Sequence, residues 1–326
     1  MNLRIPTALV ASAIMLGAAL APASAHAQQY PSKPLKLVVP IAPGGAPDVL
    51  ARALADRLGP VLGQTVVVEN RTGANGNIAM ESVAASPPDG YTLVIAHDSL
   101  LAINPHLYKT KLNTLKDFTP VAMIAASSSF LLVVPSTSPV KTFPEFIEYA
   151  KAANPPLAYA SGGSGSLHHL SMELLKLRSG INLMHVPYKG GAPAVVATIA
   201  GEVSAAVTSS VTSAHVRSGK LRALAVTGSS RLATLPDVPT IAEFYPGFQM
   251  SSWFGIFAPA GLPAPVLAKL RADIARVLDT PEIRTRFQNA GDFVPYVMTP
   301  EEFTARIAGD YDKFGKLVKQ IGMKVD

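Results

Sequence analysis

The sequence lacks the residues on which several classes of protein depend. None of its 326 residues is cysteine, and no run of five or six like charges occurs. Without cysteine the chain can form neither disulfides nor the thiolate ligands of most structural zinc sites. Without a basic tract it offers no typical binding segment for nucleic acid. We therefore expect no metal centre, no cofactor and no nucleic-acid partner.

The long apolar stretch at the N-terminus has the pattern of an export signal. Arg4 precedes an apolar run from Ile5 to Leu20, and Ala25-His26-Ala27 supplies the small residues of a cleavage site. The alternative is a membrane anchor, but these 16 residues are fewer than the ~20 that span a bilayer. We predict that residues 1–27 are a signal peptide and that the rest of the chain is soluble in the periplasm.

Residues 28–326 form a chain of 299 residues, enough for one large domain or two modest ones. Removing Arg4 from the 28 basic residues leaves 27, against 22 acidic ones, so the net charge is +5 with histidine neutral. This balance favours anions mildly.

Strand-like and helical patterns alternate over the first two-thirds, which is typical of parallel βαβ units. We expect strands at 35–41, 65–70, 91–97, 157–161, 183–188 and 221–227, and helices at 46–58, 77–85 and 192–200. A further helix should place Leu167, Leu170, Leu174 and Leu177 on one face and end at Gly180.

The chain after residue 251 is mainly helical. Helices are expected at 265–278 and after Pro281, and a long one should begin at Thr299, where Glu302 completes a capping box. Because a terminal helix of this kind usually packs on an earlier domain, we predict two α/β lobes joined by two chain crossings. Residues 28–129 and 252–326 would form lobe 1, and residues 130–251 lobe 2.

Common catalytic signatures are absent from the sequence. It contains no G-x-x-x-x-G-K-[ST], no G-x-G-x-x-G after a strand and no H-E-x-x-H. The segment around Ser164 misses the last glycine of a G-x-S-x-G elbow. A secreted hydrolase that uses Ser164 or Ser166 with His168 or His169 is an alternative, but the absences point away from an enzyme.

A turn rich in Gly or Ser follows a strand and precedes a helix three times, at Gly44-Gly45, at Gly162 to Ser166 and at Gly190-Gly191. The start of a helix leaves backbone N–H groups unpaired, and an anion placed there gains about 0.3–2 kcal/mol. Glycine permits close approach, and Ser161, Ser164 and Ser166 add hydroxyl donors. Each could be an ordinary turn, but three of them at strand ends predict an anion site.

The acid in the first turn of the predicted helix at 46–58, Asp48, has two interpretations. It stabilises the helix start by charge and hydrogen bonding, or it orients a bound water.

Longer motifs carry a resemblance. The stretches "VVPIAPGGAPDVLARAL", "AINPHLYK", "HVPYKGGAPAV", "GKLRALAVT", "LPDVPTIAE" and "SSWFGIFAPAG", in this order, resemble the Bug-type (Bordetella uptake gene) extracytoplasmic solute receptors, the binding proteins of tripartite tricarboxylate transporters. The similarity covers essentially the whole chain after residue 27. It implies the type II periplasmic-binding-protein fold, a small carboxylate held between two lobes, and membrane permease subunits as partners. We expect a monomer.

The resemblance also implies a binding site. Its residues would be Ile41, Ala42, Pro43, Gly44, Gly45, Asp48, Asn77, His97, Asp98, Ser99, Ser161, Ser164, Gly165, Ser166, His169, Tyr188, Lys189, Thr208 and Ser209. Lys189 could instead be a solvated surface lysine.

Two positions depart from the family pattern. Ile41 stands where the family usually has Phe, which removes an aromatic wall, and the loop at 203–211 is altered. Thr208 and Ser209 replace an acid and an amide, so a ligand's ammonium group would lack a partner unless Asp98 supplied one. We predict an unaminated mono- or dicarboxylate, aliphatic or aromatic. A receptor that feeds a signalling partner would use the same fold.

Overall fold

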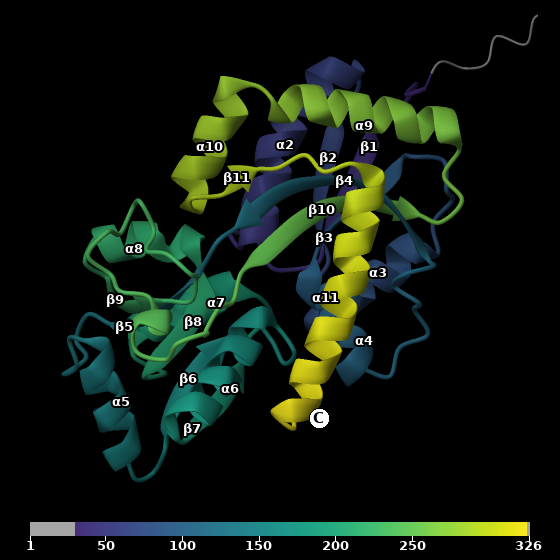
Figure 1. Cartoon of the computed structure of the whole chain (residues 1–326). Coiled ribbons are helices and arrows are strands. Elements are labelled where there is room, and N and C mark those ends of the chain that lie inside the picture. The colour runs from purple at the N-terminus through teal and green to yellow at the C-terminus, as the bar shows by residue number, and fades with distance from the viewer. Residues whose placement is uncertain (1–29, 325–326) are drawn as a thin grey trace, which may run out of the picture.

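Two separate sheets, each covered by helices on both faces, make up the two lobes of the protein (Figure 1). This computed structural model describes residues 30–324, and the signal peptide predicted at 1–27 lies outside them. The α/β two-lobe architecture predicted from the sequence is confirmed.

The first lobe is built on a six-stranded sheet with the order β11-β4-β10-β3-β1-β2. Its strands are β1 (Leu35–Val39), β2 (Val66–Asn70), β3 (Thr92–His97), β4 (Phe118–Ser127), β10 (Ser252–Pro259) and β11 (Val294–Pro295). β1 pairs in parallel with β2 and β3, as the βαβ pattern predicts, whereas β10 runs antiparallel to both β3 and β4.

The second lobe has a five-stranded sheet with the order β7-β6-β8-β5-β9. Its strands are β5 (Phe130–Pro135), β6 (Leu157–Ser161), β7 (Leu183–Pro187), β8 (Ala205–Ser209) and β9 (Leu221–Val226). β6 is parallel to β7 and β8, so both strands that precede the turns at 162–166 and 188–190 end at the same edge.

Helices cover both faces of the first sheet. One buried cluster joins the sheet to α2 (Ala46–Leu62), α9 (Ala264–Leu278) and α10 (Pro281–Gly291). A cluster on the other face joins it to α3 (Asn77–Ala84), the π-helical turn η2 (Ser99–Ile103) and α11 (Pro300–Gln320). The short turn η1 (Ala74–Gly76) precedes α3, and α4 (Asn104–Leu107) follows η2.

The second sheet is covered by α5 (Phe143–Ala152) and α6 (Leu167–Ser179) on one face and by α7 (Gly191–Ala200) on the other. Shorter pieces are η3 (Ser210–Thr212), α8 (Ser213–Arg217) and η4 (Ile241–Glu243). The predicted apolar face of α6 is partly wrong. Leu167 and Leu170 are buried, but Leu177 is 52% exposed, and Leu175 lies in the core in its place.

The chain passes between the sheets twice, and hydrogen bonds join the two crossings. Residues 128–129 connect β4 to β5, and the second crossing leads into β10. Thr227 accepts a hydrogen bond at Oγ1 from the N–H of Phe130 (2.8 Å) and donates one to the carbonyl of Met250 (2.8 Å). The residue bounds of the two lobes stay a prediction.

The last helix, α11, contacts both lobes. The predicted capping box of Thr299 and Glu302 is present at its start. Phe303 and Ile307 belong to the core of the first lobe, whereas Phe314 and Val318 belong to a cluster that includes α6 of the second. Figure 1 shows α11 running down the length of the first lobe.

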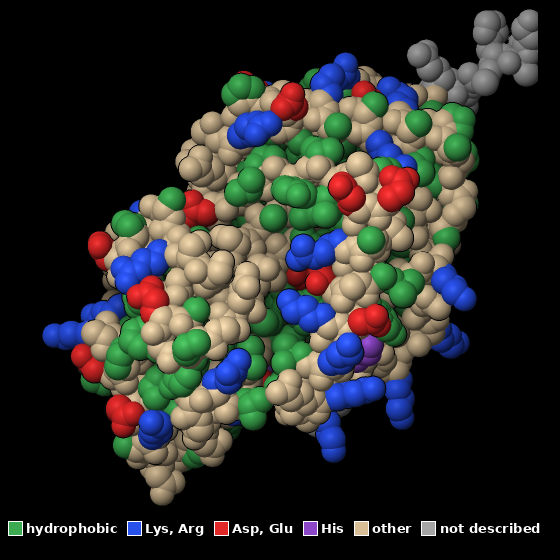
Figure 2. Space-filling view, viewed as in Figure 1, with side chains coloured by type: hydrophobic (Ala, Val, Ile, Leu, Met, Phe, Trp, Pro, Cys, Tyr) green, Lys and Arg blue, Asp and Glu red, His purple; other side chains and the backbone are tan. Residues whose placement is uncertain are grey.

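An apolar surface lies beside the outer edge of the first sheet. Val294, Tyr296 and Val297 are 47–59% exposed, and Figure 2 shows apolar side chains gathered between α10 and α11. The edge strand β11 is only two residues long and contains Pro295, so its shortness and its proline, rather than charged side chains, limit pairing at this edge.

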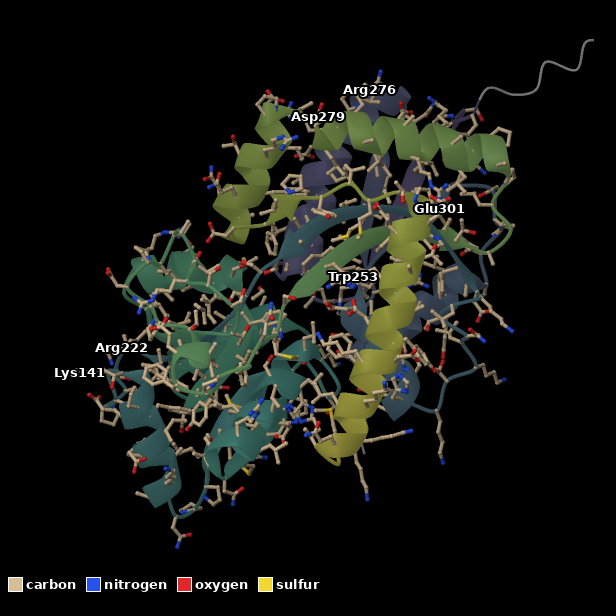
Figure 3. The ribbon with its side chains drawn as sticks, viewed as in Figure 1. Lys141, Arg222, Trp253, Arg276, Asp279 and Glu301 are labelled. Carbon is tan, nitrogen blue, oxygen red and sulfur yellow. The ribbon has the colours of Figure 1, made fainter. Side chains whose placement is uncertain are left out.

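The single tryptophan, Trp253, forms a hydrogen bond that joins β10 to α11, and a substitution can test how much this bond stabilises the protein. Figure 3 shows Trp253 beside this helix, where its Nε1–H donates to Oδ2 of Asp310 at 2.8 Å while Nε of Arg306 donates to the same atom. Asp310→Ala would leave a buried indole N–H unpaired and should lower the free energy of unfolding by about 1–3 kcal/mol. Urea denaturation followed by tryptophan fluorescence measures this. Asp310→Asn keeps an acceptor and should cost less, and equal losses in both variants would contradict the assignment.

Candidate functional site

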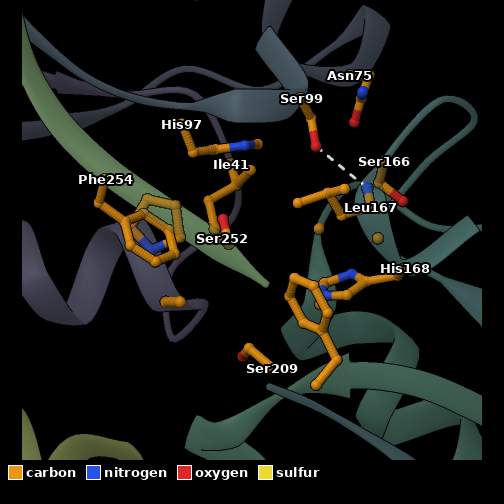
Figure 4. A pocket seen from close by; sticks show the side chains of 16 residues that line it. Ile41, Asn75, His97, Ser99, Ser166, Leu167, His168, Ser209, Ser252 and Phe254 are labelled. Carbon is orange, nitrogen blue, oxygen red and sulfur yellow. Dashed lines mark hydrogen bonds between the residues drawn. The ribbon is translucent and has the colours of Figure 1, made fainter. Parts of the chain in front are cut away.

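A cavity of about 50 Å³ lies between the two lobes (Figure 4). Its apolar walls are formed by Ile41, Ala46 and Pro47, which lie between β1 and the start of α2, and by Phe130, Leu167 and Phe254. Its polar lining consists of Asn75, His97, Ser99, Ser166, His168, Ser209 and Ser252, together with Gly162, Gly190 and Gly191. Both lobes thus contribute to one cavity, which is called the inner cavity below.

Three helices begin at the wall of the inner cavity. Ala46 starts α2, Leu167 starts α6 and Gly191 starts α7, and all three residues line the cavity. These helices are 17, 13 and 10 residues long, so each directs the positive end of its dipole there. In α6 the N–H groups of Leu167 and His169 are already used by the hydroxyl oxygens of Ser99 and Ser166. An anion in the cavity would be stabilised by three helix starts.

The turn at the start of α2 is held by Asp48. Gly44 has φ +84°, the conformation that favours glycine, whereas Gly45 is extended with φ −79°. Oδ2 of Asp48 accepts from the N–H of Gly44 (2.9 Å), and its two oxygens also accept from Arg52 and Asn70. Burial alone would raise the pKa of Asp48, but these hydrogen bonds lower it overall. Asp48 therefore supports the turn, and it lines neither the inner cavity nor the second cavity described below.

The two lobes touch directly across the cleft. The N–H of Ala42 donates to the carbonyl of Lys189 (3.3 Å), and the N–H of Leu167 donates to Oγ of Ser99 (3.1 Å; dashed in Figure 4). The Tyr108 hydroxyl donates to the carbonyl of Ser164 (2.6 Å). These contacts define a closed arrangement.

Asp98 lies behind the wall of the inner cavity. Its carboxylate accepts from the N–H of Ser99 (3.0 Å), the hydroxyl of Ser252 (2.9 Å) and the N–H of Trp253 (3.3 Å). Burial raises the pKa of Asp98, and the neighbouring His97 opposes that rise. Its acceptors are occupied by internal donors, so it orients Ser99 and Ser252, which do line the cavity.

The two adjacent histidines have different positions from those expected. His169 is stacked on His185 with ring centroids 3.7 Å apart, and its Nδ1 accepts the N–H of Gly165 (3.2 Å). His168 lines the cavity, packs edge-on against Phe130, and its Nδ1 is buried without a hydrogen-bond partner in the described residues. Burial lowers the pKa of His169 to about 3 and that of His168 to about 4, so both are neutral at pH 7.

A second cavity, the outer cavity, adjoins the first and has a volume of about 200 Å³. Ser164, Tyr188 and Lys189 line it from the second lobe, and Tyr108 from the first. Asn75 lines both cavities and has φ +48°, a conformation uncommon outside glycine. Its Nδ2 donates to Oδ1 of Asn104 (2.7 Å), which fixes the amide.

The residues predicted from the sequence divide into three groups. The inner cavity is lined by Ile41, His97, Ser99, Ser166 and Ser209. The outer cavity is lined by Ile41, Ser164, Tyr188 and Lys189. Neither cavity is lined by the remaining eleven, which are Ala42, Pro43, Gly44, Gly45, Asp48, Asn77, Asp98, Ser161, Gly165, His169 and Thr208.

Eight side chains that line the inner cavity are not among the site residues predicted from the sequence: Ala46, Pro47, Asn75, Phe130, Leu167, His168, Ser252 and Phe254. Phe130, Ser252 and Phe254 lie just beyond the two predicted crossings, which is the signal that could have found them. No comparable signal distinguishes His168 from His169.

Within residues 30–324 no cluster of three or more His, Asp or Glu side chains could hold a metal ion. Over the same residues no helix combines the length and apolar character needed to cross a membrane.

Comparison with known proteins places the chain in a family. The sequence profile of the "Tripartite tricarboxylate transporter family receptor" matches residues 50–323. Protein BugT of Bordetella pertussis (strain Tohama I) is 36% identical over 329 residues, covering 100% of both chains. The chain belongs to this receptor family.

Solved structures of similar receptors agree with the fold. R. palustris Rpa4515, solved with adipate, is 34% identical with a TM-score of 0.86, and the match covers 90% of this chain and 99% of that one. MatC of Rhodopseudomonas palustris, solved with bound malate, is 33% identical with a TM-score of 0.81, covering 89% and 100%. The present protein is thus a Bug-type periplasmic binding protein, as its motifs indicate.

The buried histidines of this receptor predict how its stability depends on pH. The pKa of His185 is lowered by burial to about 4, like that of His168. In the unfolded chain a histidine pKa is about 6.5. Between these values the unfolded state binds more protons, so the free energy of unfolding falls as the pH is lowered from about 7 to 5.

Urea unfolding at pH 7, 6 and 5 measures this dependence. His185→Gln should flatten it relative to the unaltered protein, because one proton-binding difference is removed. An unchanged slope in the variant would mean that the His169–His185 stack does not contribute.

Proposed function

We propose that this receptor captures a small unaminated carboxylate in the closed cleft and delivers it to the membrane permease subunits of a tripartite tricarboxylate transporter. The observation that carries the proposal is that three helix starts meet at a cavity whose lining contains no Asp or Glu. Such a site favours a negative charge and offers no partner for a positive one. The receptor would act as a periplasmic monomer after removal of residues 1–27.

The nearest acids do not supply a partner for an ammonium group. Asp48 and Asp98 each accept at least three hydrogen bonds from protein groups. At the altered loop, Ser209 lines the inner cavity, while Thr208 is buried against Thr212 with their hydroxyl oxygens 2.9 Å apart. Burying an unpaired cation costs several kcal/mol, so an amino acid would bind poorly.

The solved relatives support a carboxylate ligand, since adipate and malate occupy two of them and neither molecule carries an amine. The geometry does not favour the hydrolase alternative. Oγ of Ser166 accepts the backbone N–H of His169 as a helix cap (3.2 Å), and the imidazole of His169 faces His185. In the Ser161–His185 pair, Oγ and Nε2 lie 2.6 Å apart, but Ser161 is buried, His185 is partly buried, and neither residue lines either cavity.

Closure would move lobe 1, residues 28–129 and 252–326, against lobe 2, residues 130–251. Ligand groups that contact both lobes would then stabilise the closed form.

Filling the cavity from the start of α7 tests the site. A Cβ at Gly191 would meet Cε1 of His168 at 3.5 Å and Oγ1 of Thr208 at 3.8 Å, both ordinary contacts, so the branches of a valine would project into the cavity. Gly191→Val should weaken binding of succinate or glutarate by about 1–3 kcal/mol, or roughly 5- to 150-fold, with the fold intact. Isothermal titration calorimetry measures the affinity and circular dichroism the fold.

Gly309→Val provides the control, because a Cβ at this exposed position of α11 meets no atom within 4 Å. If the two variants bind equally well, the cavity is not the binding site.

Ligand charge is tested with matched pairs. Succinate should bind more tightly than aspartate, and glutarate more tightly than glutamate, each by at least about 100-fold, since the ammonium group would be buried without a partner. Calorimetry at pH 7 gives both affinities. A consistent preference for the amino acid, removed by Asp98→Asn, would overturn the proposal and make Asp98 the determinant.

A further inference from the structure

The loop at 162–166, which joins β6 to α6, meets the first lobe directly. The carbonyl of Ser164 accepts the Tyr108 hydroxyl at 2.6 Å. A Cβ at Gly165 would lie 2.9 Å from Cδ1 of Leu107 and 3.4 Å from Cε2 of Tyr108, so the backbone of the loop packs against the end of α4. The closed arrangement therefore depends on the shape of this loop, which is called the closing loop below.

Two stacked histidines hold the closing loop from behind. Nδ1 of His169 accepts the N–H of Gly165 (3.2 Å), and the ring of His169 stacks on that of His185 with centroids 3.7 Å apart. Nε2 of His185 lies 2.6 Å from Oγ of Ser161, and this oxygen accepts the N–H of Gly163 (3.1 Å). The pair thus supports the loop at two glycines, although neither imidazole lines a cavity.

The hydrogen bond to Gly165 needs a neutral imidazole. Nδ1 of His169 can accept only while it carries no proton, and a proton there would turn it toward the N–H of Gly165 as a second donor. Burial, His185 and Lys176 lower the pKa of His169 to about 3, and burial lowers the pKa of His185 to about 4. The closed arrangement therefore resists the proton.

The charged groups around the pair do not offer a free partner for an imidazolium. Oε1 of Glu173 lies 3.9 Å from Nε2 of His169. The same oxygen already accepts the Tyr159 hydroxyl (2.7 Å) and the ammonium group of Lys176 (2.9 Å). Glu173 opposes the fall in the pKa of His185, whereas Lys176 adds to it. A proton on the pair would thus share its counter-charge with two other donors.

We propose that the His169–His185 pair is a proton-sensitive support of the closing loop. With both imidazoles neutral the loop is held for contact with the first lobe, and a proton on His169 releases Gly165 and favours the open form. This inference rests on the proposed capture of a ligand by closure and adds its regulation by acid. Both histidines are positioning residues, because they act through the loop.

The direction of the effect follows from proton binding. The open form, in which the loop is released, takes up the proton at a higher pH than the closed form, with the value of about 6.5 for a solvated histidine as the upper limit. Ligand affinity is therefore full above the pKa of the open form and falls as the pH is lowered toward that of the closed form. The fall is at most 10-fold per pH unit for each proton.

Two substitutions separate the acceptor from the ring. His169→Asn keeps an acceptor near the position of Nδ1 that does not titrate, whereas His169→Leu offers none. At pH 7, His169→Leu should bind succinate roughly 5- to 20-fold more weakly than His169→Asn, since it leaves the N–H of Gly165 unpaired. Isothermal titration calorimetry gives the affinities, and circular dichroism verifies the fold at each pH. Equal affinities of the two variants would contradict the role of the acceptor.

The pH dependence is tested by comparing proteins. The carboxylates of succinate also titrate below pH 7, so the quantity measured is the affinity of the unaltered protein divided by that of His169→Asn at the same pH, in which the ligand's titration cancels. This ratio should fall at least about 3-fold between pH 7 and 5. His215→Asn is the matched control, because His215 lies on α8, lines neither cavity and should follow the unaltered protein. A constant ratio would overturn the proposal.

A measurement without ligand keeps this test separate from the proposed function. In protein made with isotope-labelled glycine, the nuclear magnetic resonance signal of the Gly165 amide should shift between pH 7 and 4 in the unaltered protein and in His215→Asn, but not in His169→Asn. An equal shift in His169→Asn would overturn the role of His169. If the signal behaves as expected while neither succinate nor glutarate binds, the support of the loop stands and the proposed function fails.

Discussion

The N–H groups at the first turn of each helix are the constraint on which the site depends, because they have no partner inside the helix. Parallel pairing of β6 with β7 makes these strands end at one edge, so the helices that follow them, α6 and α7, begin there too. The same holds for β1 and α2 in the other lobe. These two edges face each other across the cleft. Positive partial charge is therefore concentrated at the inner cavity, although no lysine or arginine lines it.

Supporting side chains then fix the loops in place. Asp48, Asp98 and His169 each accept backbone N–H groups of a loop that forms the wall, and none of them reaches the cavity. The sequence places all three in the predicted binding site, because they adjoin the glycine turns and strand ends at which a ligand is expected. In the structure their acceptor atoms are used internally. This division leaves the lining of the inner cavity to hydroxyl groups, two imidazoles, one amide, glycine backbone and apolar side chains.

The sequence was a good guide where local pattern decides structure. Capping at Thr299, the C-terminal glycine of α6 and the order of strands and helices all follow from short-range rules. It was a poor guide where tertiary contacts decide. His168 and His169 are equivalent in pattern, and only the packing against Phe130 and His185 assigns one to the cavity and the other to the stack. The pattern of Phe130 and Phe254 is that of buried strand residues, and both are buried, but each also lines the inner cavity.

The contact that joins Ala42 to Lys189 runs from one main chain to the other. The strength of this hydrogen bond does not depend on which side chains occupy those positions. The N–H groups at the helix starts are likewise independent of the side chains. Substitution of the side chains that line the cavity would therefore change its shape and polarity and leave this main-chain contact between the lobes in place. For a receptor that works as proposed, ligand preference would then change through few substitutions, without loss of the bond that joins the lobes.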